Sequence, residues 1–454
     1  MDNHGDRLPV RNSLSARIRT GAHSAGKEIA FFLKWVVISM IIGLAAGLAG
    51  TAFSYGLKFA NRTIAAHPAL MFGLPVAGVL IVWLYHITGR ANDKGTDQIL
   101  LSVQTGERVS IIVAPLIVLS TILTHLFGGS AGREGAALQM GGSIASGIGK
   151  LFRLDKREMQ LIAMCGMSAG FAALFGTPVA AAVFALEVAG VGVIGYPAFA
   201  PCVIAGLTAS RLAAVLGVEA EHFTILSVPA LTSGSLCKVL ILSALCAGVS
   251  ILLCVAMHTV SDLMKKYFKN PYLRAAAGGA IIILLTLILR TNDYLGAGMN
   301  VILQSFNGSA RPEAFLLKIL FTAITLGSGF KGGEIVPSFF IGSVFGCVFG
   351  NLLGFSPSLC AAVGMLAVFC GATNSPFTAL LIGLELCGAS GVQALPYFLL
   401  AAAVSFTLSG DFSLYHNQVF LFPKDEAAYI APKGEFDSEQ GFWVDTSSHS
   451  ESHS

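Results

Sequence analysis

Two glycine-rich hexapeptides in this sequence fit one pattern, GxxGxE: GSAGRE at residues 129–134 and GFKGGE at residues 329–334. A second pair of matching blocks follows them in the same order: Gly166-Met167, Pro178 and Glu187 in the first case, and Gly364-Met365, Pro376 and Glu385 in the second. In both blocks the Pro comes 12 positions after the Gly, and the Glu comes 9 positions after the Pro. Two matches in the same order indicate an internal duplication, which is common among transporters.

The chain is far more apolar than a water-soluble protein. Of its 454 residues, 54% are hydrophobic and 12% are charged, whereas charged residues make up about a quarter of a typical soluble domain. A helix pairs its own backbone groups and crosses a hydrocarbon core of about 30 Å with about 20 apolar residues. The clearest such stretches are residues 29–59, 70–85, 109–127, 196–216, 236–257 and 275–289. We therefore predict an all-α, multi-pass integral membrane protein of the plasma membrane.

Composition divides the chain into five parts. They are a basic N-terminal segment (1–28), a first membrane repeat (29–217), a connecting loop (218–235), a second membrane repeat (236–420) and a polar, partly disordered tail (421–454). The basic residues before the first span are Arg7, Arg11, Arg17, Arg19 and Lys27. By the positive-inside rule they predict a cytoplasmic N-terminus. The net charge of +3 is too small to indicate a nucleic-acid partner.

Each GxxGxE turn joins one hydrophobic segment to the start of another. At membrane depth, irregular backbone is tolerated only where it is buried in protein or lines a cavity. A helix that begins there points unpaired N–H groups and the positive end of its dipole into that cavity. The two turns therefore predict an anion site that carries no full positive charge. Such a site suits transport, because the anion must bind and also leave.

Glu134 stands at the first of these predicted helix starts. Its carboxylate is itself an anion, so it can occupy the site when ionised and leave when protonated, which would couple anion passage to protons. Alternatively, Glu134 pairs with Arg133 at a membrane surface. Glu334 is either a second proton-handling carboxylate or a cap of its turn paired with Lys331. For Glu187, as for its counterpart in the second repeat, Glu385, a structural pairing role is favoured over catalysis.

At these residues the chain resembles the CLC family of anion channels and proton-coupled anion transporters. Gly132-Arg133-Glu134-Gly135 resembles the family's gating-glutamate motif, with Ala136 where Pro is usual. The segment 332–337 resembles its second-half filter motif, GGxxxP, and Leu414-Tyr415 resembles the segment that carries its inner-gate tyrosine. The resemblance covers roughly residues 30 to 420.

This resemblance implies a fold of two inverted structural repeats, about eighteen helices, whose broken helices meet at a central anion site. It also implies a homodimer with one pore in each subunit and Glu134 as the external gate. The backbone N–H groups implied to hold the anion are those near Arg133, Gly135, Glu334 and Ile335. The hydroxyl group of Tyr415 is implied to guard the inner end of the pore.

The sequence departs from the chloride-conducting members at two places. Those members carry GSGIP ahead of the gating motif, but residues 94–98 read KGTDQ here, where Thr96 either replaces the anion-binding serine hydroxyl or only caps a helix. The position of the inner proton-transfer glutamate of chloride antiporters falls on Val188. The fluoride-exporting branch shares the first departure and has a filter similar to GFKGGE. We therefore expect fluoride/proton antiport that exports fluoride, with Glu334 supplying the missing proton step. The alternative is chloride transport by a voltage-gated channel or a chloride/proton exchanger.

An enzyme is the competing class. Residues 128–132 fit GxSxG, the nucleophile elbow of serine hydrolases, but that elbow follows a strand, whereas a membrane helix is expected before Ser130. The nine cysteines lie in or beside apolar segments without CxxC spacing, as packing residues do. We therefore expect no enzymatic activity, no cofactor and no metal site.

Overall fold

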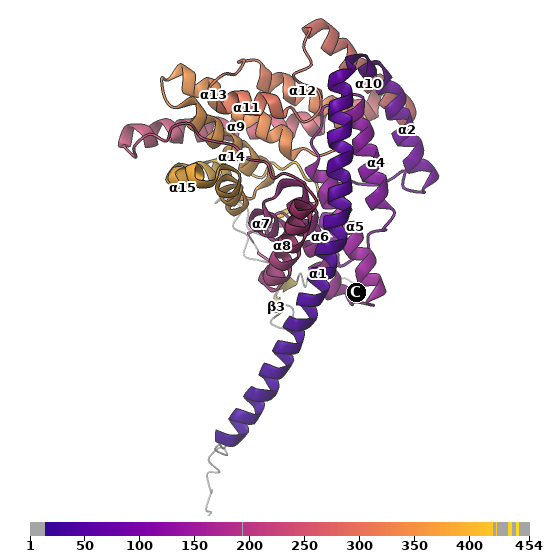
Figure 1. Ribbon diagram of the computed structural model, residues 1–454, viewed down its shortest axis with the longest axis vertical. Coiled ribbons are helices and arrows are strands. Elements are labelled where there is room, and N and C mark those ends of the chain that lie inside the picture. Colours follow the sequence, from indigo (N-terminus) through magenta and orange to yellow (C-terminus); the bar gives the residue numbers. More distant parts are fainter. Residues whose placement is uncertain (1–13, 193, 421–423, 425–434, 438–441, 445–454) are drawn as a thin grey trace, which may run out of the picture.

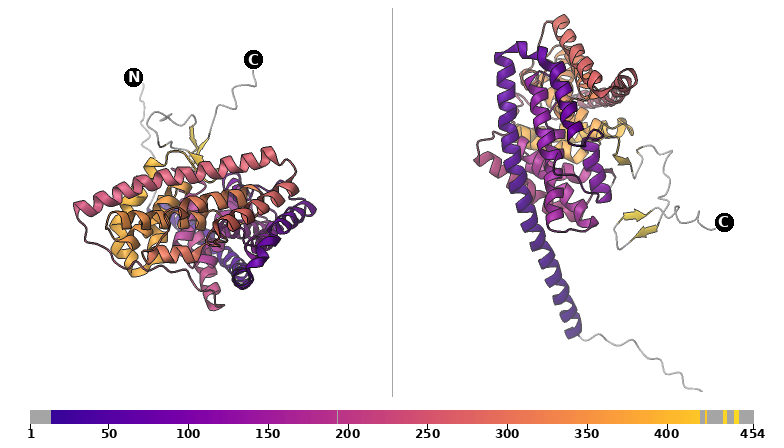
Figure 2. Two further views of the ribbon diagram at one scale, coloured as in Figure 1. Left: turned by 90° about the horizontal axis from the view of Figure 1, so that it is seen from above. Right: turned by 90° about the vertical axis from the view of Figure 1, so that its right-hand side faces the viewer.

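The fold is an all-α membrane fold, as predicted. The computed structural model describes residues 14–192, 194–420, 424, 435–437 and 442–444 (Figures 1 and 2). The first half contains α1 (Leu14–Ala66), η1 (Pro68–Gly73), α2 (Leu74–Ile87), α3 (Thr96–Thr105), α4 (Val113–Leu126), α5 (Glu134–Leu151), α6 (Lys156–Phe175), α7 (Pro178–Glu187), β1 (Gly190–Val191), η2 (Tyr196–Ala198) and α8 (Phe199–Val215). The second half contains α9 (Ser233–Tyr267), α10 (Pro271–Leu289), α11 (Met299–Phe306), α12 (Ala314–Gly327), α13 (Ile335–Leu352), α14 (Pro357–Thr373), α15 (Pro376–Leu408) and β2 (Val419–Phe420).

Eight helices in the described part of the chain are long and apolar enough to cross a membrane. The stretch 109–127, predicted as a full span, is shorter: α4 has 14 residues, which is about 21 Å of helix. It ends because the chain turns at Gly128, whose φ of +79° lies in the left-handed region that glycine adopts without strain. α4 therefore delivers the first GxxGxE turn to the interior of the bundle.

The five predicted parts of the chain remain a prediction, because no observation tests their boundaries. Of the segment 1–28, residues 1–13 lie outside the described residues, and α1 begins at Leu14. The tail 421–454 is described only at residue 424 and at the two paired strands β3 (Glu435–Asp437) and β4 (Phe442–Val444).

Two glycine-mediated helix pairs form the centre of the two repeats. α5 packs on α6 where Gly141 meets Gly166, and α13 packs on α14 where Gly342 meets Gly364. A β-carbon at any of these four glycines would lie closer than 3.0 Å to the facing backbone. Small residues let membrane helices approach this closely, and the equivalent pairs occupy equivalent positions in the two repeats.

The carboxylates of Glu187 and Glu385 tie the two repeats together reciprocally. Glu187, at the end of α7, accepts hydrogen bonds from the backbone N–H groups of Phe377 (3.0 Å) and Thr378 (2.9 Å) at the start of α15. Glu385, in α15, accepts from the N–H groups at 179 and 180 at the start of α7, at 3.1 and 2.8 Å. A carboxylate at a helix N-terminus satisfies unpaired donors and the helix dipole. These contacts agree with the structural pairing role predicted for both residues.

A short parallel strand pair brings the C-terminal segment back to the first repeat. Gly190 and Val191 of β1 pair with Val419 and Phe420 of β2. Next to it, the side chain of Gln418 donates to the carbonyl oxygen of Val188 at 2.9 Å. The segment that carries Tyr415 is therefore held against the centre of the molecule.

Candidate functional site: a meeting point of two helix N-termini

The two GxxGxE turns pair with each other through their backbones. The N–H group of Gly132 donates to the carbonyl oxygen of Gly333 at 2.7 Å, and that of Gly333 donates to Gly132 at 2.9 Å. α5 begins at Glu134 and α13 begins at Ile335, directly after this bridge. The bridge between the turns is antiparallel, and Figure 1 shows α5 in the lower part of the molecule and α13 in the upper part. The repeats are thus inverted, and both helix N-termini converge here.

The Glu134 side chain lies on this pair of N-termini. It is fully buried, and its Oε2 atom accepts hydrogen bonds from the N–H groups of Arg133 (3.0 Å) and Val336 (3.2 Å), one from each repeat. Its Oε1 atom lies 3.6 Å from Nε of Arg133 and has no hydrogen-bond partner among the described residues. The carboxylate therefore occupies the place where backbone amides of both repeats converge. The carboxylate lies in the protein interior, whereas the alternative interpretation placed Glu134 and Arg133 as a pair at the membrane surface.

Arg133 is held from the other side of the turn. Its guanidinium group forms an ion pair with Glu221 in the connecting loop and lies over the ring of Phe175, 5.5 Å from the centroid. Its side chain is 18% exposed. Because Glu221 neutralises it, Arg133 does not present an unpaired positive charge at the amide site.

The residues expected to bind the anion lie around the same point, with one difference in the donor. A β-carbon added at Gly135 would lie 3.1 Å from the Cα atom of Gly333 and from Oγ1 of Thr96, and 3.3 Å from Oε2 of Glu334. Ile335 is fully buried beside it. The amide of the second repeat that contacts the Glu134 carboxylate is that of Val336, one position after Ile335. Sequence reasoning did not single out Val336.

Glu334 makes neither of the contacts that a capping role would require. It stands at the N-cap position of α13, but its side chain makes no capping hydrogen bond. Lys331, the proposed partner, lies 3.6 Å from Asp93 and over the ring of Tyr85, 4.2 Å from the centroid. The Glu334 Oε2 atom is buried without a hydrogen-bond partner in the described part of the chain. Since most buried polar atoms are paired, this carboxylate oxygen is an exception in the interior.

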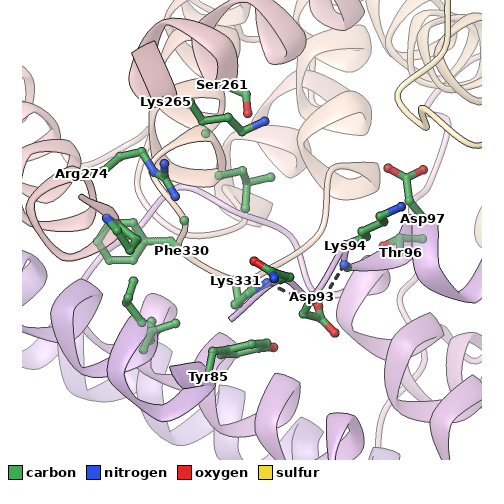
Figure 3. Close-up of a pocket in the computed structure, with 18 of the residues that line it drawn as sticks. Tyr85, Asp93, Lys94, Thr96, Asp97, Ser261, Lys265, Arg274, Phe330 and Lys331 are labelled. Atoms are coloured by element: carbon green, nitrogen blue, oxygen red, sulfur yellow. Dashed lines mark hydrogen bonds and ion pairs between the residues drawn. The ribbon is translucent and has the colours of Figure 1, made fainter. Parts of the chain in front are cut away.

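Glu334 and Tyr415 line a cavity of about 1210 Å³. Figure 3 shows other residues of its wall, among them Thr96, Lys265 and Lys331. The Tyr415 hydroxyl group is buried and has no hydrogen-bond partner within the described ranges, and Thr96 accepts a hydrogen bond from Gln139 at 3.3 Å. The cavity also adjoins the end of α9, which carries Lys265 in its last turn. By the positive-inside rule this end is cytoplasmic. The loop that holds Glu221 precedes the 35-residue helix α9 and lies on the opposite side.

Lys318 is a further residue near the site that the sequence motifs did not reveal. This lysine is fully buried in α12, and its Nζ atom donates to Oγ of Ser130 (3.0 Å) and to the carbonyl oxygens of Tyr294 (3.1 Å) and Gly296 (2.6 Å). A single lysine inside an apolar helix is unusual and could have signalled it. Lys318 therefore holds the turn that leads to Glu134. The Ser130 hydroxyl group has a structural role in this contact, because it accepts the Lys318 hydrogen bond. Helix α4, not a strand, precedes Ser130, in contrast to a nucleophile elbow.

Comparisons with known proteins agree with this geometry. The family model described as "Voltage gated chloride channel" matches residues 77–410. A chloride/fluoride channel protein of Pseudomonas syringae pv. tomato is 34% identical over 395 residues, which is 86% of this chain and 87% of the relative. The crystal structure of a CLC-type fluoride/proton antiporter superposes with a TM-score of 0.82 at 35% identity, covering 86% of this chain and 98% of that one. A slow cyanobacterial Cl⁻/H⁺ antiporter, at 20% identity and a TM-score of 0.70, shares the fold.

Proposed function

Because this chain belongs to the CLC family of voltage-gated chloride channels and related anion transporters, we propose that it exports fluoride across the plasma membrane in exchange for protons. The observation that carries the proposal is the position of the Glu134 carboxylate, which accepts amide hydrogen bonds from Arg133 in one repeat and Val336 in the other. The same amides are the donors that a transported anion would need.

Exchange follows from competition for these donors. An ionised Glu134 is held by two N–H groups and by the positive ends of two helices. Protonation removes its charge, and most of that attraction is lost. A fluoride ion can then take its place, because it is small, anionic and a strong hydrogen-bond acceptor. Each turnover therefore links the release of the site by a protonated side chain to its occupation by an anion.

The second carboxylate supports protons as the coupled ion. Val188, where chloride antiporters carry their inner proton-transfer glutamate, is buried and has an apolar side chain. Glu334 instead places a buried carboxylate at the cavity wall, against Gly135 and therefore next to Glu134. We infer that Glu334 receives the proton that Glu134 brings inward. Chloride transport is the alternative, and the absence of the GSGIP serine argues against it.

We also propose a homodimer in the lipid bilayer, on the basis of the family alone. Arg133, Gly135, Ile335, Thr96 and Tyr415 are proposed to line the ion path, since all lie around the amide site or the cavity below it.

Proteoliposomes test this function. Vesicles loaded with fluoride and diluted into fluoride-free buffer are expected to take up protons against a pH gradient, whereas chloride-loaded vesicles are not. Glu134→Gln, which resembles the protonated side chain, is expected to lose proton uptake. Glu219→Gln is the matched control, because its side chain is 89% exposed and pairs only at 3.6 Å with Lys58. Fluoride efflux without proton uptake in the unaltered protein would contradict the antiport.

A further inference from the structure

The wall of the cytoplasmic cavity carries two separate sets of ionisable side chains. Cations gather where α9 leads into α10: Lys265, Lys269 and Arg274. Figure 3 shows Lys265 and Arg274 on one side of the cavity, whereas Asp97 lies on the other side next to Thr96. His416 also lines the cavity and comes from the segment that carries Tyr415.

Asp97 and His416 form a fixed pair. Oδ2 of Asp97 lies 3.6 Å from Nδ1 of His416. Asp97 also accepts a hydrogen bond at Oδ1 from the N–H group of Asn417 (3.1 Å), while the Asn417 side chain donates to the Asp97 carbonyl oxygen (3.2 Å). The His416 ring stands edge-on to that of His258, with centroids 4.1 Å apart. A small rotation of the imidazole closes a separation of 3.6 Å to a direct hydrogen bond.

This pair connects the buried site to the cytoplasm. The His416 side chain is 64% exposed and that of Asp97 is 19% exposed, while Glu334 is half-buried and its Oε2 atom is buried. Asp97 follows Thr96, whose hydroxyl group faces Gly135 together with Oε2 of Glu334. Exposure to solvent thus falls from the His416 side chain to that of Asp97, and it is lost at the Oε2 atom of Glu334.

The cations explain why a separate proton path would be needed. Positive side chains at the mouth of a cavity raise the local concentration of an anion and repel protons. An imidazole changes its charge near neutral pH, and a carboxylate within hydrogen-bond reach or one water of it can exchange protons with it. The loop before α3, residues 88–95, carries one carboxylate, Asp93, whose Oδ1 atom lies 3.6 Å from Nζ of Lys331. The other charged groups on the loop are Arg90 and Lys94, of which Lys94 lines the cavity.

We propose that Asp97 and His416 are the cytoplasmic proton port of the exchanger, and that fluoride enters past the cationic wall opposite. The neutral Glu334 carboxyl group gives its proton, directly or through water, to the Asp97 carboxylate. Asp97 passes the proton to one ring nitrogen of His416, and the other ring nitrogen releases a proton to cytoplasmic water. Asp97 and Glu334 end as carboxylates and His416 ends neutral, so one proton leaves. This inference rests on the proposed fluoride/proton exchange.

The experiment measures fluoride efflux and proton uptake in the same proteoliposomes. Asp97→Asn retains an Oδ1 acceptor for Asn417 but cannot carry a proton, and His416→Ala removes the imidazole. Both variants are expected to lower proton uptake at least about tenfold. Free imidazole on both sides of the membrane is expected to restore uptake by His416→Ala in part. The matched control is His86→Ala, because His86 lines the same cavity but lies 2.7 Å from the Tyr272 hydroxyl group.

Two results would overturn the port: wild-type proton uptake in both variants, or a slow His416→Ala variant that imidazole does not accelerate. The latter would assign His416 a structural role. The unaltered protein separates the two levels of the proposal. If it takes up no protons against a gradient, the exchange function itself is wrong, whereas intact coupling in both variants removes only the port.

Discussion

Gly333→Ala perturbs the amide site without changing any charge. A β-carbon at Gly333 would lie 2.5 Å from the backbone nitrogen of Gly135 and 3.0 Å from that of Glu134. Ordinary van der Waals contact begins at 3.4 Å, so one turn must move by about 0.9 Å relative to the other, from 3.4 minus 2.5. This movement strains the two hydrogen bonds between Gly132 and Gly333, of 2.7 and 2.9 Å.

The size of the effect follows from these contacts. Weakening two hydrogen bonds costs about 1–3 kcal/mol, and a misplacement of about 1 Å at a reacting site can cost about 100-fold in rate. We therefore expect Gly333→Ala to lower fluoride efflux roughly 100-fold, measured with a fluoride electrode on proteoliposomes, with a modest fall in Tm. Gly248→Ala in α9 is the matched control, because a β-carbon there meets nothing within 4 Å. Wild-type efflux by Gly333→Ala would refute the reasoning that the paired turns position the amides.

Three further predictions concern the groups around the site. Glu187→Ala removes the acceptor for two N–H groups and for the Thr378 hydroxyl group (2.7 Å). We expect the free energy of unfolding, followed by thermal unfolding, to fall by roughly 3 kcal/mol or more, and by less in Glu187→Gln. Lys318→Met leaves two buried carbonyl oxygens without this donor and should lower Tm by an amount that corresponds to about 1–3 kcal/mol, with slower fluoride efflux because the turn at Ser130 loosens. Burial lowers the pKa of Lys424 to about 8. Between pH 8 and the ordinary lysine pKa the unfolded chain binds more protons than the folded chain, so the free energy of unfolding should rise with pH over that interval. Unfolding scans at pH 8 and pH 10 should show this rise, and Lys424→Met should abolish it.

Hydropathy and the repeated motifs predicted most of the spanning helices and the position of the site. The apolar stretches gave most of the spanning helices, and the repeated GxxGxE blocks correctly located the two helix starts that meet at Gly132 and Gly333. Three spanning helices, residues 156–175, 335–352 and 376–408, were not among those stretches. The stretch 109–127 was wrong as a full span, because hydropathy alone does not show that the helix stops at Leu126. Apolar composition records burial in lipid or protein, but a break in a helix depends on what the turn must contact.

The parts of the site that sequence could not give are contacts between distant segments. Val336 donates to Glu134 across 202 positions, Lys318 contacts Ser130 across 188, and Asn417 contacts Asp97 across 320. Val336 and Asn417 are ordinary in their own segments, and Lys318 is unusual in its helix but does not reveal its partner. Only the packing of the two repeats brings each partner within reach. A motif can therefore mark a site, whereas the identity of each donor requires the fold.

The duplication itself explains how one site can handle an anion and a proton. Glu134 and Glu334 occupy the same position of the repeated motif, yet only Glu134 reaches the amide of the other repeat, Val336. The residue before each differs: Arg133 is anchored to Glu221 on the outer side, whereas Gly333 has no side chain to anchor. Two carboxylates in similar frames thus face different surroundings, one the shared amides and the other the cytoplasmic cavity. In the proposed exchange this asymmetry separates the two roles, because Glu134 competes with the anion for the shared amides while Glu334 passes the proton toward the cavity.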